Sequence, residues 1–450
     1  MERQSSAAAE WDEGMSMNST GHRQRHHAPC DIGFQDALRL TLEALSPLPP
    51  VSVPVLDAAD FVAPDDCRAR ANSPSVTSSL KDGFAVYAAD IAEATAEKPV
   101  RLTVCGSAYA GSGSAPGLVR GEAVRVTTGA MLPEGADAVL AVEFARDEDA
   151  SVLCLRDAPA GKNIQRQGED VAAGEIVVER GLRITPARAG LLAAAGLAEV
   201  RVHRRPSVGV LATGDEVVLP GEPLKPGQLY ASNIVTLFGW LRRFGMVAEA
   251  ARSPDSAPTI REAAAGLLDR HDALLTSGGA WKSERDLTVR IMEDLGGELL
   301  YERVRIGPGK AVALAIAGGK PVFCLPGGPS SNEMAFLHLA LPALLRLAGL
   351  SPEPFERRVA RLDAAVEGTA EWTQFFQATL AEEGGALVAR PLRGPSRLRA
   401  QALAVAIVTL PQGCRRLDAG METQVQILHP GAAWRPLLRS GAASPGSASR

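Results

Sequence analysis

The sequence predicts a multidomain α/β plus β protein. We expect a doubly wound parallel-sheet domain, an inserted β-rich domain before it and a C-terminal β-barrel or sandwich after it. Three observations predict this class. The chain has 450 residues, too many for one hydrophobic core. Strand-like apolar runs alternate with helical spacing between residues 206 and 350. Short strands broken by Gly, Pro and Asp occupy the stretches on either side.

Composition narrows the class of protein. The net charge is −5, so no basic surface favours nucleic acid as a partner. We expect no membrane partner either, because no run of about 18 apolar residues occurs. The N-terminus lacks the charged-then-apolar order of a secretory segment, and the six cysteines are dispersed without a C-x-x-C pair. Reduced thiols and a cytoplasmic location are therefore expected.

The first half of the chain is predicted in four segments. Residues 1–29 have no periodicity and are predicted to be a disordered tail. An amphipathic helix from Phe34 opens a linker domain of residues 30–70 and 171–205, whose second segment contains the helical stretch PARAGLLAAAG. Residues 71–170, between those segments, are predicted to be the inserted β-rich domain.

The second half of the chain begins with the alternating pattern. Residues 206–350 contain the apolar runs VGVLATG, DALLTSGG and PVFCLPGG, each followed by helical spacing, which predicts a parallel sheet covered by helices on both faces. Residues 351–429 return to short strands and are predicted to form the C-terminal β domain. Residues 430–450 are predicted to be a second disordered tail.

The three apolar runs end in loops of small residues: TGDE (213–216), TSGG (276–279) and LPGGP (325–329). Loops after the carboxyl ends of parallel strands lie at one edge of the sheet, where ligands bind. Glycines let backbone N–H groups approach an anion closely. The pattern therefore predicts a site for a phosphate or a similar oxyanion. Its candidate residues are Thr213, Gly214, Gly278, Gly279 and Gly327.

Acidic residues accompany these loops. Asp215 and Glu216 lie in the first loop, and Asp286 follows Gly279 by seven residues. Carboxylates beside an anion site need a divalent cation to offset their charge, and hard oxygen ligands favour Mg²⁺. The alternative is that Asp215 and Glu216 only cap a helix or a hairpin.

Two cations and three turns complete the candidates. Lys310 lies on the turn GPGKA, and Arg303 lies on an expected strand before it; a lone cation is usually solvated, but the rigid turn favours phosphate contact. In the β-rich domain SSLKDGFAV contains Asp82, RVTTGAMLPEGADAV contains Thr128, and GKNIQRQGED contains Asp170. Each motif alone reads as a β-turn, so only their combination is informative.

These segments, in this order, resemble the MoeA/gephyrin family of molybdopterin molybdenumtransferases from about residue 32 to 428. KDGFAV is similar to the family's M-D-G-Y-A, TTGAMLPEGADAV to its T-G-x-x-P-x-G-x-D-x-V, and GKNIQRQGED to its G-x-N-x-R-x-x-G-E-D. LATGDEVVLPGEPLKPGQLYASN is similar to its S-T-G-D-E-L segment with Y-x-x-N, and LPGGPSS to its L-P-G-N-P-x-S.

The resemblance implies insertion of molybdate into adenylylated molybdopterin with release of AMP, assisted by Mg²⁺. It also implies an elongated homodimer, whose cleft is shared between the β-rich domain of one subunit and the α/β domain of the other. Molybdopterin adenylyltransferase and downstream molybdoenzyme chaperones are possible further partners. The functional positions that it implies are Asp82, Thr128, Asp170, Glu216, Asp286, Arg303, Lys310, Pro326, Pro329 and, near the oxyanion, Ser331.

The chain departs from the family pattern at four places. Arg303 lies where the family has a lysine, which keeps the charge, and Pro254-Asp255 lies where the family has a D-D pair before the second α/β helix. GGAWKSERD has Trp281 where the family has serine, and GPGKA has Gly307 where the family has lysine. We hypothesise that Lys282, beside Trp281, returns the lost charge to the oxyanion pocket; the alternative is that Lys282 points to solvent. Two other functions stay open from the sequence: adenylylation of molybdopterin with ATP, and a non-catalytic role as a cofactor-binding or scaffolding protein.

Overall fold

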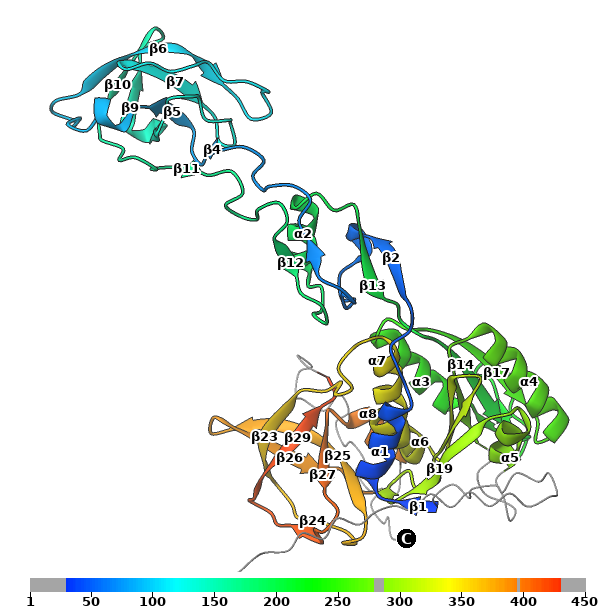
Figure 1. Cartoon of the computed structure of the whole chain (residues 1–450). Coiled ribbons are helices and arrows are strands. Elements are labelled where there is room, and N and C mark those ends of the chain that lie inside the picture. The colour runs from blue at the N-terminus through cyan, green and yellow to red at the C-terminus, as the bar shows by residue number, and fades with distance from the viewer. Residues whose placement is uncertain (1–29, 279–286, 395–396, 430–450) are drawn as a thin grey trace, which may run out of the picture.

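The computed structural model describes residues 30–278, 287–394 and 397–429. The predicted tails, residues 1–29 and 430–450, lie outside the described residues. The molecule is elongated, with a β-rich module at one end and a narrow connecting region in the middle (Figure 1). At the other end an α/β sheet and a β-barrel lie side by side (Figure 1).

The β-rich module contains a six-stranded sheet of order β8-β5-β7-β6-β10-β9. All neighbours in it are antiparallel except β6 and β7. Its core contains the buried side chains of Phe84, Leu102, Leu140 and Val152. The elements are β5 (Gly83–Val86), η2 (Ala88–Asp90), β6 (Val100–Ala108), β7 (Glu122–Val126), β8 (Ala138–Ala141), η3 (Val142–Phe144), β9 (Ala145–Asp147) and β10 (Ser151–Cys154), with the small pair β4 (Ser78–Ser79) and β11 (Ile164–Gln165) at its base.

Two chain segments form the connecting region, one before the β-rich module and one after it. β2 (Pro50–Pro54) pairs with β13 (Glu199–His203), and β3 (Cys67–Arg68) pairs with β12 (Ile176–Val178). The helix that the sequence predicts here is α2 (Pro186–Ala194), which begins where the Thr185 hydroxyl accepts a hydrogen bond from the Arg188 N–H at 3.2 Å. Pro186 occupies the first turn, where a missing N–H costs nothing. The short η1 (Val55–Asp57) packs beside α2.

The α/β sheet has the order β1-β19-β21-β22-β18-β14-β17. Helices cover both of its faces, as predicted: α1, α3, α6 and α7 share one buried cluster with Val208 and Val210, and α4 and α5 share another with Leu211 and Val322. The strands are β1 (Cys30–Ile32), β14 (Ser207–Thr213), β17 (Val247–Ser253), β18 (Ala273–Ser277), β19 (Glu298–Val304), β21 (Ala313–Ala317) and β22 (Lys320–Leu325). The helices are α1 (Phe34–Glu43), α3 (Ser232–Arg243), α4 (Ala257–Arg270), α5 (Leu287–Asp294), α6 (Pro329–Ala335), the π-helical η4 (Phe336–Ala340) and α7 (Leu341–Leu347), and a small pair β15 (Val217–Val218) and β16 (Leu229–Tyr230) precedes α3.

The sheet is mixed and mostly parallel, which refines the predicted parallel sheet. β22, β18, β14 and β17 run parallel to one another, whereas β21 runs antiparallel to both of its neighbours. The reason is the two-residue turn Gly318-Gly319, which has φ of 56° and 79° and directly joins β21 to β22. Such a turn requires positive φ at both positions and reverses the chain as a hairpin.

The C-terminal part is a five-stranded barrel, one of the two forms that the sequence predicts. Its strands follow the order β25-β26-β23-β29-β27, and pairing of β27 with β25 closes it. They are β23 (Arg357–Leu362), β25 (Thr373–Glu383), β26 (Ala386–Pro391), β27 (Ala406–Leu410) and β29 (Glu422–Ile427), with β20 (Ile306–Gly307) on β25, α8 (Arg397–Leu403) before β27, and the pair β24 (Val366–Glu367) and β28 (Arg416–Leu417). Among the described residues, no helix has the length and apolar character needed to cross a membrane.

Candidate functional site

The three loops predicted to bind an anion lie together. β14, β18 and β22 are neighbours and run parallel, so their carboxyl ends share one edge of the sheet. Gly278 has φ of 111°, and a Cβ there would lie 2.4 Å from the carbonyl oxygen of Thr213. A Cβ at Gly327 would lie 3.5 Å from the Cα of Gly278. The backbones therefore approach one another too closely for a side chain at Gly278.

Thr213 contributes backbone to this site. Its side chain is buried, and the Thr213 hydroxyl has no hydrogen-bond partner among the described residues. Pro326 is also buried, whereas Gly327 is exposed at the tip of its loop and Pro329 is half-buried at the first turn of α6. Of the predicted loop glycines that the structure describes, Gly327 is exposed, Gly278 is half-buried and Gly214 is buried.

Three acidic residues lie in or beside the first loop. A Cβ at Gly214 would lie 2.5 Å from Oε2 of Glu216, and Oδ1 of Asp215 accepts a hydrogen bond from the Asp255 N–H at 3.2 Å. Burial, and then the charges of Glu216 and Asp215, raise the pKa of Asp255. Asp255 was not among the site candidates from the sequence, where it stands only as part of the departure from the family's D-D pair. It follows β17, which pairs with β14 and brings its end to the same edge.

Part of the predicted set cannot be placed. Gly279, Trp281, Lys282 and Asp286 lie outside the described residues, so the metal role of Asp286 and the rebuilt pocket around Lys282 stay predictions. Within the described residues no group of three or more His, Cys, Asp and Glu side chains is arranged to hold a metal ion.

Of the two predicted cations, Arg303 lies in β19, and Lys310 lies at the end of the turn that follows β20. The Val304 N–H donates to the Lys310 carbonyl, and the Arg303 N–H donates to the Val312 carbonyl, each at 3.0 Å. Arg303 is exposed and has φ of 59°, a conformation that costs a residue with a Cβ about 1–2 kcal/mol. The ammonium of Lys310 lies 5.8 Å from the ring centroid of Trp372.

The same turn contacts the helix that follows the third loop. A Cβ at Gly309 would lie 3.2 Å from the carbonyl oxygen of Ser331, in the first turn of α6. Lys310 is therefore the next residue after Gly309, whose backbone contacts the segment of Ser331. This contact brings the predicted Ser331 and Lys310 segments together.

Two asparagines hold the third loop. Nδ2 of Asn332 donates to the Ser277 hydroxyl at 3.0 Å and to the Pro326 carbonyl at 2.9 Å. Nδ2 of Asn233 donates to the Ser277 hydroxyl at 3.1 Å and to the Gly327 carbonyl at 2.8 Å. Neither asparagine was among the site candidates from the sequence. Asn233 on α3 is the Asn of the Y-x-x-N motif, which marked the segment without giving this side chain a role, and Asn332 on α6 lies in none of the quoted motifs.

The remaining candidates lie in the β-rich module. Oδ1 of Asp82 accepts hydrogen bonds from the Thr128 N–H at 2.6 Å and from the Thr128 hydroxyl at 2.9 Å. These two bonds lower the pKa of Asp82. Asp170 is exposed, and its Oδ1 accepts a hydrogen bond from Nε2 of Gln165 at 3.0 Å.

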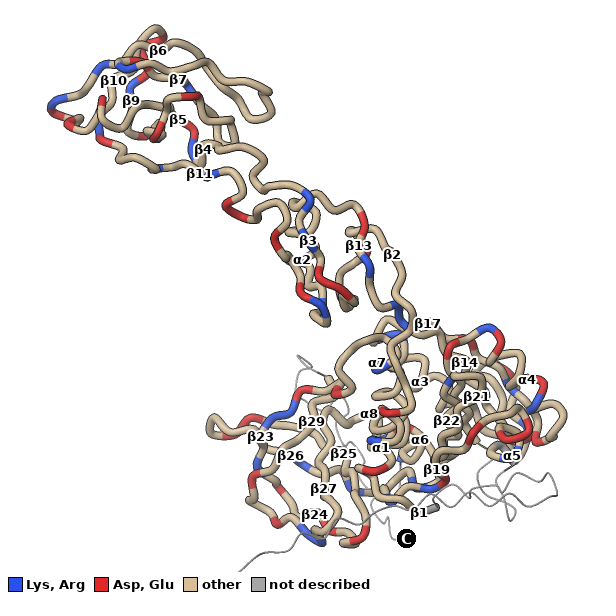
Figure 2. The backbone as a smooth tube through the Cα atoms, viewed as in Figure 1, with Lys and Arg blue, Asp and Glu red and all other residues tan. Residues whose placement is uncertain are grey.

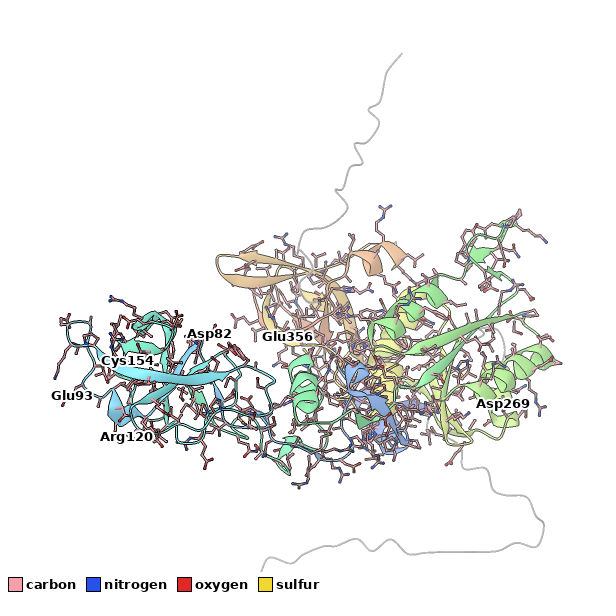
Figure 3. All side chains as sticks on the ribbon, turned by 90° about the horizontal axis from the view of Figure 1, so that it is seen from above. Asp82, Glu93, Arg120, Cys154, Asp269 and Glu356 are labelled. Atoms are coloured by element: carbon pink, nitrogen blue, oxygen red, sulfur yellow. The ribbon has the colours of Figure 1, made fainter. Side chains whose placement is uncertain are left out.

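The candidates thus form two separate groups within one chain. Figure 3 shows Asp82 in the β-rich module, at the opposite end of the molecule from Asp269 on α4. In Figure 2, acidic and basic residues are interspersed along both ends of the chain. The pair formed by Asp82 and Thr128 is therefore remote from the loops of the α/β sheet in the same chain.

Comparisons with known proteins show the family of the chain. Residues 32–196 match the family model of the MoeA N-terminal region (domain I and II), and residues 209–346 match that of the "Probable molybdopterin binding domain". Molybdopterin molybdenumtransferase 2 of Mycobacterium tuberculosis is 34% identical over 404 residues, which are 87% of this chain and 98% of the relative. Molybdopterin molybdenumtransferase of Bacillus subtilis is 32% identical over 390 residues, 82% of this chain and 88% of the relative.

Solved structures indicate the same family. A crystal structure of the molybdopterin biosynthesis MoeA protein from Pyrococcus horikoshii has a TM-score of 0.76 and 32% identity, and covers 89% of this chain and 99% of that one. A second has a TM-score of 0.72 and 25% identity, with coverage of 88% and 100%. The similarity spans the β-rich module and the α/β sheet together, which the adenylyltransferase alternative does not require. The chain belongs to the MoeA family of molybdopterin molybdenumtransferases, transferases of molybdenum cofactor biosynthesis.

Proposed function

We propose that the chain transfers molybdate to adenylylated molybdopterin with release of AMP, in a cleft that two copies of the chain form together. The observation that supports this most directly is the meeting of three glycine-containing strand ends at one edge of the sheet, beside Lys310. Glycine backbones admit a phosphate or a molybdate within hydrogen-bonding distance of N–H groups. A substrate with both an anionic phosphate and an incoming dianion fits such an edge.

The carboxylates beside this edge fit Mg²⁺. Mg²⁺ binds in proteins through one or two carboxylates together with substrate phosphates and water, so a complete protein cage is not required. Asp215 and Glu216 lie in the first loop. Burial raises the pKa of Asp255, and the charges of Glu216 and Asp215 add to the shift; a cation would offset those charges. Bound there, Mg²⁺ would supply Lewis-acid polarisation of the adenylate phosphate.

The other residues of the site would act by positioning the two substrates. The loop glycines and the segment of Lys310 and Ser331 would hold molybdate, and Arg303 would add a second cation. Molybdate and the dithiolene sulfurs of the pterin would then be held near one another, which lowers the entropic part of the barrier. Excluding water from the same cleft would strengthen the contacts to the leaving AMP.

The β-rich module would complete the cleft from the second copy. Asp82 is held by two donors from Thr128, which favour its ionised form and lower its pKa. A fixed carboxylate on the facing wall could accept hydrogen bonds from the amino groups of the pterin. Asp170, which lies in the same module, would be the second acidic group of that wall.

One assay tests the function. Purified protein is mixed with adenylylated molybdopterin, Mg²⁺ and molybdate, and AMP is followed over time. We expect AMP release that depends on molybdate, and that falls by about 10²-fold in Lys310→Ala if that cation stabilises developing charge. A variant of an exposed lysine in the β-rich module, Lys98→Ala, serves as the control. AMP release that does not depend on molybdate would overturn the proposal.

A further inference from the structure

The third loop of the α/β edge is tied from beneath by three side chains. Ser277 and Asn332 are buried, with 5% and 1% of their surfaces exposed, and Asn233 is half-buried. The two side-chain amides share the Ser277 hydroxyl as an acceptor, and each donates to one carbonyl of the loop. We call Ser277, Asn233 and Asn332 the amide clamp.

The geometry of the peptide bond gives the clamp a direct consequence. In a trans peptide unit the C=O and the N–H point in opposite directions. The Pro326 carbonyl points inward to Asn332, so the Gly327 N–H points outward. The Gly327 carbonyl points to Asn233, so the Gly328 N–H points away from Asn233. The clamp therefore fixes the direction of two consecutive backbone donors.

These two donors have no acceptor among the described residues. Within the described ranges, neither the Gly327 N–H nor the Gly328 N–H donates a hydrogen bond to the protein. Gly327 is exposed, and Gly328 is partly exposed. Pro329, the next residue, has no N–H, and the Gly328 carbonyl already accepts from the Asn332 N–H at 2.8 Å. The loop thus presents two directed donors and no outward carbonyl between them.

A cation stands near the same donors. A Cβ at Gly328 would lie 3.4 Å from Nη1 of Arg397, which comes from α8 beside the barrel. Arg397 is exposed. Two aligned N–H groups beside a guanidinium suit an oxyanion, because an anion accepts hydrogen bonds and an outward carbonyl would repel it.

We infer that Asn332, Asn233 and Ser277 are positioning residues that set the affinity of the LPGGP loop for the transferred oxyanion. This inference rests on the proposed function and names the residues that prepare its oxyanion site. Without the clamp the two peptide units could rotate and turn a carbonyl toward the anion. The loss should then appear in oxyanion binding and leave the rate at saturating molybdate nearly unchanged.

The experiment uses neutral variants, so that no added charge repels the anion. Asn332→Ala and Asn233→Ala each release one peptide unit, and Ser277→Ala removes the shared acceptor. Thr41→Val is the matched control. Thr41 is fully buried on α1 and hydrogen-bonded to Tyr301, so its loss costs stability without touching the loop. Molybdate binding to the full chain is measured by calorimetry, and AMP release is measured against molybdate concentration.

We expect each asparagine variant to bind molybdate about tenfold more weakly, which corresponds to roughly 1.4 kcal/mol. The molybdate concentration for half-maximal AMP release should rise by a similar factor, with kcat within about threefold of the parent because the reacting groups are unchanged. Thr41→Val should match the parent in both measurements.

The outcomes separate this inference from the proposed function. If the parent binds molybdate and the asparagine variants bind it equally well, the clamp has no positioning role, whatever the AMP assay shows. If kcat falls in the variants while molybdate affinity is unchanged, the inference is also wrong. If one variant fails to fold, the other asparagine variant still decides the question, because each holds a different peptide unit. If the parent binds molybdate but releases no AMP, the proposed function fails and the clamp is still tested by calorimetry.

Discussion

At the scale of single residues, Asp272 shows how one charge fixes the start of β14. Its carboxylate oxygens accept hydrogen bonds from Nη1 and Nη2 of Arg204, both at 2.6 Å, and from the Ser207 N–H at 2.9 Å. Burial alone would raise the pKa of Asp272, but Arg204 and Ser207 together lower it to about 2. The pair lies where β13 of the connecting region passes into β14.

Removing this carboxylate should destabilise the α/β sheet. A lowered pKa contributes stability above the unfolded value of 3.8, and that stability is lost as the pH falls toward about 2. Asp272→Asn should therefore cost about 2 kcal/mol at pH 7 and progressively less below pH 4. Urea unfolding of the parent and the variant at pH 7 and at pH 3 checks this, with the exposed Asp269→Asn as the control. Equal losses at pH 7 and pH 3 would show that the charge is not the cause.

At the scale of elements, α6 is held on two sides. Asn332 faces the third loop, and its neighbour Glu333 faces the barrel side. Oε1 of Glu333 accepts from Nε1 of Trp240 on α3 at 2.9 Å, and Oε2 accepts from Nε2 of Gln377 on β25 at 3.1 Å. One buried carboxyl on α6 thus connects α3 and the barrel.

The carboxyl of Glu333 should make stability depend on pH. Burial raises the pKa of Glu333 above 4.5, although its donors oppose the shift. A raised pKa contributes stability that is complete below pH 4.5 and is lost as the pH rises through the folded value. Glu333→Gln is neutral throughout, so the stability advantage of the parent over this variant should be larger at pH 4 than at pH 8. The exposed Glu262→Gln is the control, and a difference that does not change with pH would contradict the prediction.

At the scale of the whole molecule, the distance between the β-rich module and the α/β edge requires a second copy if both form one cleft. Figure 1 shows the connecting region holding the two ends apart. In a homodimer, the β-rich module of each subunit would then complete the site at the α/β edge of the other subunit. Two-fold symmetry would produce two equivalent clefts.

Mixed dimers test this arrangement. Asp82→Ala and Glu216→Ala proteins should each be inactive, but a one-to-one mixture should recover about a quarter of the parent AMP release, because half of the dimers keep one intact cleft. Two affinity tags isolate the hybrids. A mixture of Asp82→Ala with Thr128→Val should not recover, because both changes lie in the same module. Hybrids without any rescue would place the site within one chain.

The sequence by itself determined the local features of this protein. Residues 213–216, 276–279 and 325–329 could be recognised as strand-end loops, because alternation of apolar runs with helical spacing is a short-range pattern. The turn Gly318-Gly319 between apolar runs was also readable, and it would have predicted the antiparallel β21. Asp82 and Thr128 could be named by motif. The domain boundaries at residues 71, 171, 206 and 351 stay predictions.

Only the tertiary structure decided which of these residues meet. Asp255 joined the carboxylates because β17 pairs with β14, and Asn233 and Asn332 met at Ser277 because α3 and α6 pack on the same face of the sheet. The barrel closed because β27 pairs with β25, and Asp82 ended up remote from the sheet because the connecting region extends. These contacts join residues far apart in the chain. Their formation depends on packing and pairing across the whole fold, which no local pattern encodes.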